Sequence, residues 1–82
     1  MQKKEHGVDI AREIDTCGLN CPLPMLRTKK ALAELASGQV LRVLATDPGA
    51  VSDFEAFTRQ TGHILLESKQ EKAMFTFLIQ HR

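Results

Sequence analysis

The sequence predicts an α+β fold: a two-layer α/β sandwich of order βαβαββ, with a mixed four-stranded sheet and two helices on one face. Two segments carry apolar side chains at helical spacing, and four shorter segments show the alternating or continuous apolar runs of strands. Two amphipathic helices need one apolar surface to cover, and a sheet provides it. The 82 residues are enough for one domain, predicted over 8–82 after a flexible N-terminal tail over 1–7.

The first half of the domain is predicted as a strand, a loop and a helix. Residues 8–15 alternate in places and indicate the first strand. Residues 16–20 contain Gly18 and Asn20 and indicate a loop. The helix is predicted over 22–37, with Gly38 as its stop. Its apolar side is expected to comprise Met25, Thr28, Leu32, Leu35 and Ala36, opposite Arg27, Lys30 and Glu34.

The second helix is predicted to follow a central strand. Residues 39–46 form a near-continuous apolar run, which is typical of a strand buried on both faces or in the centre of a sheet. Asp47 is predicted to cap the helix, with Pro48 at its first position and Gly62 after its end. The expected buried face consists of Val51, Phe54, Phe57, Thr58 and Thr61.

Two further strands are predicted at the end of the chain. Residues 63–69 form one and residues 72–81 the other, with Gln70 and Glu71 as a tight polar connection. A short connection makes this last pair antiparallel. The two β–α–β units, in contrast, predict parallel strands joined by right-handed crossovers. The phenylalanines fall at core spacing rather than on a base-stacking surface.

Composition excludes little and indicates an ordinary soluble domain. Net charge is +1, which neither favours nor excludes nucleic acid or an anionic membrane. No apolar run approaches a membrane span, and the polar first seven residues contain no apolar signal segment, so a cytoplasmic location is expected. The two cysteines stand in a C-x-x-x-C spacing, so reduced thiols are the simpler interpretation.

The residue that most clearly points to chemistry is Cys21, in the segment Cys21-Pro22-Leu23-Pro24. Pro22 suits the first position of a helix, which places Cys21 at or next to its N-cap. The positive end of the helix dipole favours a thiolate, and thiol pKa values fall at such positions. We therefore predict an activated, exposed sulfur at the start of the helix. The alternative is a half-buried cysteine that only packs.

Several residues near Cys21 are candidates for supporting roles. Arg27, Lys29 and Lys30 form a basic cluster one to two turns past it. This cluster is either an ordinary solvated helix face or a docking patch for acidic partners that also aids the thiolate. Asp15 is expected to fix the loop by accepting hydrogen bonds from backbone N–H groups.

The chain resembles the TusA/SirA-like sulfur carriers, a resemblance that covers nearly everything from about residue 10 onward. It lies in the stretch from Asp15 through Cys17, Gly18 and Cys21 to Pro24, in 29–32, in 46–49, and in the Asp53-Phe54 and Gly62-His63 pairs. The resemblance implies the βαβαββ sandwich and sulfane sulfur carried as a persulfide on Cys21.

The resemblance also implies partners. The donor would be a cysteine desulfurase or rhodanese-type protein, and downstream sulfur-relay proteins would receive the sulfur for tRNA 2-thiouridine formation or dissimilatory sulfur oxidation. No cofactor beyond the covalent persulfide, no direct nucleic-acid contact and no membrane contact are expected. Because a carrier must exchange partners, we expect a monomer with transient interfaces.

Other interpretations stay open at this point. Cys17 is interpreted as a loop cysteine without chemical role, but it would be the resolving thiol if the protein were a thiol–disulfide redox protein that uses Cys17 and Cys21. A non-catalytic RNA- or protein-binding module is a third class, because similar sandwiches host such roles. A metal site formed by both cysteines and His63 matches no established zinc spacing, so no metal is predicted.

Overall fold

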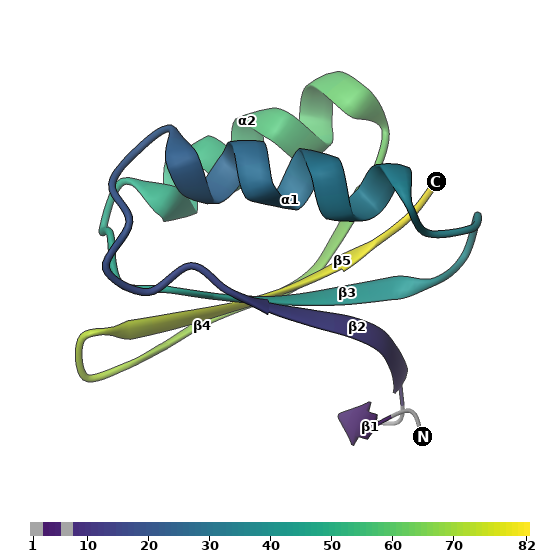
Figure 1. Cartoon of the computed structure of the whole chain (residues 1–82), viewed down its shortest axis with the longest axis horizontal. Coiled ribbons are helices and arrows are strands. Elements are labelled where there is room, and N and C mark those ends of the chain that lie inside the picture. The colour runs from purple at the N-terminus through teal and green to yellow at the C-terminus, as the bar shows by residue number, and fades with distance from the viewer. Residues whose placement is uncertain (1–2, 6–7) are drawn as a thin grey trace.

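The computed structural model describes residues 3–5 and 8–82, which form one sheet with both helices on the same face (Figure 1). Within the described residues the elements are β1 (Lys3–Glu5), β2 (Val8–Asp15), α1 (Leu23–Ala33), β3 (Val40–Ala45), α2 (Ala50–Thr61), β4 (Ile64–Glu71) and β5 (Met74–Gln80). The sheet order is β1-β2-β3-β5-β4. This arrangement confirms the predicted α+β sandwich.

The sheet has one more strand than predicted. Where a flexible tail is predicted, residues 3–5 form β1 and pair antiparallel with β2, with Lys3 opposite Ile10 and Glu5 opposite Val8. The rest of the predicted tail, residues 1–2 and 6–7, lies outside the described residues. The outer edge of β2 offers unpaired backbone groups, and a polar segment can use them without an apolar pattern of its own.

The strand pairing follows the prediction for the four main strands. β2 and β3 are parallel, and β5 pairs antiparallel with both β3 and β4. The turn between the last two strands lies later in the chain than predicted. Gln70 and Glu71, predicted as the turn, instead continue β4 and pair with Phe75 and Met74 of β5. The turn lies at 72–73, where Lys72 has a positive φ of 55°. Polar residues at an exposed strand end resemble a turn in sequence but still pair through their backbone.

α1 is shorter than predicted at both ends. Pro22 is the N-cap rather than the first helical residue, and the helix ends at Ala33 with Glu34 as its C-cap. Leu35 then donates from its N–H to the Leu32 carbonyl, a tighter bond than that of an α-helix. The predicted stop, Gly38, has a φ of 88°, which glycine adopts without strain, but it lies several residues past the helix.

The core lies between the helices and the sheet. Its largest members, Phe54 of α2 and Phe77 of β5, are fully buried with ring centroids 4.6 Å apart. Register shifts in β2 and β4 interrupt the simple alternation. As a result, Ile14 packs against this core while Ile10 joins a separate cluster with Val40 and Leu78. β3 contributes buried residues to both clusters, as its apolar run predicts.

Thr28 provides a test of core packing. Its hydroxyl is fully buried on α1, and no described residue hydrogen-bonds it. Thr28→Val keeps the shape and removes the orphaned hydroxyl, so it should raise the free energy of unfolding by about 1 kcal/mol in urea titrations. Thr58→Val is the matched control, because the Thr58 hydroxyl donates to the Phe54 carbonyl at 2.9 Å and its loss should destabilise. Equal destabilisation by both variants would contradict this account.

Candidate functional site

The candidate site lies where two loops meet at one end of the sheet. The loop from β2 to α1 and the loop from β3 to α2 leave neighbouring parallel strands at the same edge (Figure 1). Two hydrogen bonds join the loops directly: Gly18 N–H to Thr46 Oγ1 (2.8 Å) and Cys21 N–H to Asp47 Oδ2 (2.7 Å). At the start of the first loop, Thr16 donates to the Leu44 carbonyl of β3 from both its N–H (2.8 Å) and its hydroxyl (2.6 Å). The first loop is therefore fastened to the second along its length.

Asp47 has a different partner from the one predicted. The N-cap of α2 is Gly49, and no side chain caps that helix. Asp47 instead accepts from Cys21 N–H through Oδ2 and from Gly49 N–H through Oδ1, the latter at 3.2 Å. The sequence shows a capping residue next to Pro48, but it does not show that another loop brings a second N–H within reach.

Cys21 is exposed directly before the N-cap of α1. The Cys21–Pro22 peptide bond is cis, Pro22 is exposed and Pro24 is buried. In the first turn of α1, after Cys21 in the chain, Leu23 and Leu26 are 45% and 49% exposed, so this end of the helix presents apolar surface to solvent. A second protein can therefore reach this thiol without a buried pocket.

The electrostatics of the thiol differ from the prediction. The pKa of Cys21 is raised, first by its hydrogen bond with the Asp53 carboxylate, then by desolvation and by the negative charges of Asp53 and Asp47. The start of the helix also offers fewer free N–H donors than expected. Pro22 and Pro24 have no N–H, and the N–H of Leu23 donates to the Asn20 carbonyl. The predicted fall in the thiol pKa is therefore wrong for the free protein.

Asp53 is the site residue that the sequence reasoning missed. It lies in the first turn of α2, where its N–H donates to the Gly49 carbonyl at 3.1 Å. The available signal was an acidic residue six positions after Asp47, near the start of the predicted second helix. Only the parallel pairing of β2 and β3 shows that the two helix starts meet.

Asp15 and Cys17 form a local contact at the start of the loop. Asp15 Oδ1 accepts a hydrogen bond from Cys17 N–H at 2.9 Å, the kind of contact predicted for it, and this bond lowers the pKa of Asp15. Desolvation, followed by a hydrogen bond to Asp15, raises the pKa of the exposed Cys17 thiol. Gly18, with a φ of 84°, makes the turn that lets its N–H reach the neighbouring loop. Both cysteines are free thiols.

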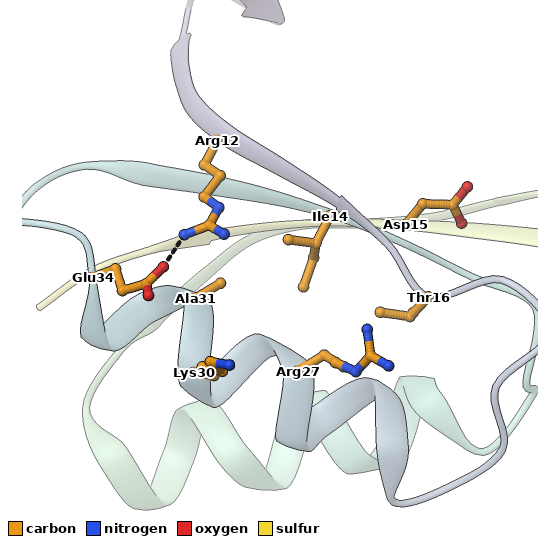
Figure 2. Close-up of a pocket in the computed structure, with 8 residues that line it drawn as sticks. All are labelled: Arg12, Ile14, Asp15, Thr16, Arg27, Lys30, Ala31 and Glu34. Atoms are coloured by element: carbon orange, nitrogen blue, oxygen red, sulfur yellow. Dashed lines mark hydrogen bonds and ion pairs between the residues drawn. The ribbon is translucent and has the colours of Figure 1, made fainter.

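The basic cluster divides between two sides of α1. Arg27 and Lys30 border a hollow of about 400 Å³ between α1 and β2 (Figure 2). In this hollow Arg12 of β2 pairs with Glu34, so its charge is already balanced. Lys29 borders a different hollow, together with His63 and residues near the end of β5. The predicted single patch is therefore two, and the pair Arg27 and Lys30 forms the one that reaches the Cys21 loop at Thr16.

His63 has a structural environment away from the cysteine loop. It follows α2, packs on Phe57 at a ring distance of 5.7 Å and on His81 at 4.8 Å, and accepts from Arg82 N–H. Desolvation, followed by the charges of His81 and Arg82, lowers its pKa. In the described part of the chain no three metal-ligating side chains gather, so the alternative of a metal site with both cysteines has no support.

Fold and site together define a small α+β protein that presents one exposed cysteine beside a helix start. The family model of the sulfurtransferase TusA matches residues 12–81, and the chain belongs to the TusA family. It is 60% identical to the sulfur carrier protein TusA of Allochromatium vinosum, over 88% of this chain and 95% of that protein. It is 58% identical to a putative sulfur carrier protein of Neisseria meningitidis serogroup A, over 84% of this chain and 93% of that protein.

The fold is also found in a solved structure. The crystal structure of a SirA-like protein from Desulfitobacterium hafniense matches with a TM-score of 0.75 and 30% identity, covering 84% of this chain and 95% of that one. Among the described residues, none of the helices has the length and apolar character needed to cross a membrane.

The bond from Asp47 to Cys21 N–H leads to a stability prediction. Asp47→Ala removes a charged acceptor from two backbone N–H groups and should lower the free energy of unfolding by about 1 kcal/mol. It should also speed hydrogen exchange at the Cys21 amide. Asp47→Asn retains one acceptor oxygen and should show a smaller loss in the same urea titration. Unchanged exchange at the Cys21 amide in Asp47→Ala would show that the bond does not hold the loop in solution.

Proposed function

We propose that this protein is a sulfur carrier that holds sulfane sulfur as a persulfide on Cys21. The observation that supports this most directly is the exposed thiol, held at the head of α1 by a loop that is itself fastened to the β3–α2 connection. Relatives that cover most of the chain are named sulfur carriers. The transferred group is a single sulfur atom, so an exposed nucleophile on a small rigid body is sufficient.

The transfer step needs no external oxidant or reductant. Cys21 loses its proton to solvent, and the thiolate attacks the outer sulfur of a donor persulfide. A new S–S bond forms to Cys21 while the donor S–S bond breaks. Its electron pair leaves with the donor thiolate, which takes up a proton. The sulfane sulfur keeps its oxidation state, and the reverse attack by an acceptor thiolate returns Cys21 to the thiol.

Residues around the thiol support this role by holding it in place. Pro22 and Pro24 restrict the backbone at the helix start. Gly18 and Asp15 anchor the loop through the bonds to Thr46 and Cys17. None of these side chains covers the sulfur in the way a substrate pocket would, which suits an atom that is delivered and collected by other proteins.

Partners are proposed from chemistry and surface. The donor is a cysteine desulfurase or rhodanese-type protein, and downstream relay proteins take the sulfur for tRNA 2-thiouridine formation or for dissimilatory sulfur oxidation. Arg27 and Lys30, at the edge of the hollow in Figure 2, suit acidic side chains of such a partner. The exposed Leu23 and Leu26 would form the apolar part of the contact. Both cysteines are free thiols in the structure, and the loading experiment below distinguishes the redox alternative.

Loading with sulfur tests the proposed function. After incubation with a cysteine desulfurase and cysteine, intact-mass spectrometry of the reduced protein should show a gain of one sulfur that dithiothreitol reverses. Cys17→Ser should gain it as the wild type does, and Cys21→Ser should not. A loss of two hydrogens without a sulfur gain, dependent on both cysteines, would instead establish the thiol–disulfide protein.

Docking through the basic pair is tested by charge reversal. The double variant Arg27→Glu/Lys30→Glu should slow loading from a protein donor by about tenfold, because a reversed charge at an interface mainly reduces the association rate. Loading from a small alkyl persulfide should not change. Arg59→Glu/Lys72→Glu reverses two exposed charges outside this surface, makes the same change in net charge and is the control. Equal slowing by this control would show that net charge, and not this surface, governs the rate.

A further inference from the structure

The loop that carries Cys21 is held at its middle by a side chain from another segment. The Gly18 N–H donates to Thr46 Oγ1 at 2.8 Å, and Thr46 directly follows the last residue of β3. Two other N–H groups of the loop bond only within their own segment: Cys17 N–H to Asp15 Oδ1 at 2.9 Å and Leu19 N–H to the Thr16 carbonyl at 3.1 Å. The Thr46 hydroxyl is therefore the contact that ties the middle of this loop to the neighbouring one.

The Thr46 bond continues the pairing of β2 with β3 after the two strands end. Among the described residues, the last backbone bond between the two segments runs from the Thr16 N–H to the Leu44 carbonyl, at 2.8 Å. Past this point the second segment turns into α2, and the Asp47 carbonyl accepts from the Ala50 N–H at 3.0 Å. The side-chain oxygens of Thr46 and Asp47 therefore take the place of strand carbonyls and receive N–H groups of the first loop.

Both partners of this bond have little freedom of their own. Thr46 is half-buried, and its branched Cβ restricts χ1, so the hydroxyl has few positions to occupy. Gly18 directs its N–H to this hydroxyl from a φ of 84°, which residues with a side chain rarely adopt. Without the Thr46 hydroxyl, the stretch 17–20 would have no bond to the neighbouring loop, and Cys21 would be tied to it through its own N–H alone.

We propose that Thr46 is a positioning residue for sulfur transfer, which fixes the Cys21 loop relative to the surface where a partner protein docks. The inference rests on the proposed function, because position matters only when a second protein delivers the sulfur. The bonds that form and break are those of the transfer step described above, and they require the reacting sulfurs to be close and aligned. A docked donor cannot follow a displaced thiol, whereas a small persulfide diffuses to it in any position.

Loading from a protein donor and from a small donor tests the inference. In a Cys17→Ser background, Thr46→Val replaces the hydroxyl with a methyl group of similar size. Persulfide formation is followed by mass spectrometry at increasing concentrations of a persulfide-bearing cysteine desulfurase. The maximum rate should fall about tenfold, while the half-saturating donor concentration should not change, because the docking surface is intact. Loading from a small alkyl persulfide should not change either. Thr46→Ser retains the hydroxyl and should recover most of the maximum rate.

Thr61→Val is the matched control. Thr61 is also half-buried, and its hydroxyl accepts from the His63 N–H at 3.3 Å, but it is the last residue of α2. This variant should load from both donors at the parent rate. An unchanged maximum rate in Thr46→Val, or an equal fall in Thr61→Val, would overturn the proposal, as would equal slowing with the alkyl persulfide.

Two further measurements keep the outcome decisive. If Thr46→Val does not fold, Thr46→Ala removes the same hydroxyl. Hydrogen exchange at the Gly18 amide should be faster in Thr46→Val than in Thr46→Ser, and equal exchange would show that the bond does not hold the loop in solution. Absence of loading from both donors in the parent would refute the proposed function, while exchange at Gly18 would still decide whether Thr46 fastens the loop.

Discussion

The hydrogen bond between the Asp47 carboxylate and the Cys21 N–H is the interaction on which the site depends. It joins residues 26 positions apart, and it forms because β2 and β3 are parallel neighbours whose following loops leave the sheet at one edge. The same carboxylate holds Gly49 N–H and thereby the start of α2. One side chain thus fixes the backbone of Cys21 relative to the start of the helix that provides Asp53.

Two opposing influences act on the Cys21 sulfur. The N-terminus of α1 favours the thiolate through its dipole, but prolines at positions 22 and 24 remove N–H donors from the end where that effect is concentrated. The carboxylates of Asp47 and Asp53 favour the thiol, and the net result is a raised pKa. The folded protein therefore combines an exposed sulfur with neighbours that favour its protonated form.

Periodicity predicts most of this fold because apolar spacing is a local property. The spacing of Phe54 and Phe57 predicts the buried face of α2, and the apolar run of β3 predicts its central place. β1 escapes prediction because the segment Lys3–Glu5 contains no apolar residue from which a strand pattern could be recognised. The partner of Asp47 and the role of Asp53 escape it because both depend on which loops a sheet brings together. Cys21 is predicted as a candidate site residue from the sequence, while the direction of its pKa shift depends on neighbours that only the fold supplies.

The loop-to-loop bonds have a consequence for how the protein is made. Gly18 and Cys21 bind partners 28 and 26 residues later in the chain, so the site does not exist until β3 and the loop after it have been synthesised and paired. Contacts of such separation form only after the chain has closed a long loop, which is a slow step compared with forming α1. During synthesis, Cys21 is therefore an ordinary cysteine in an unfastened segment, and it acquires its acidic neighbours only when the domain folds.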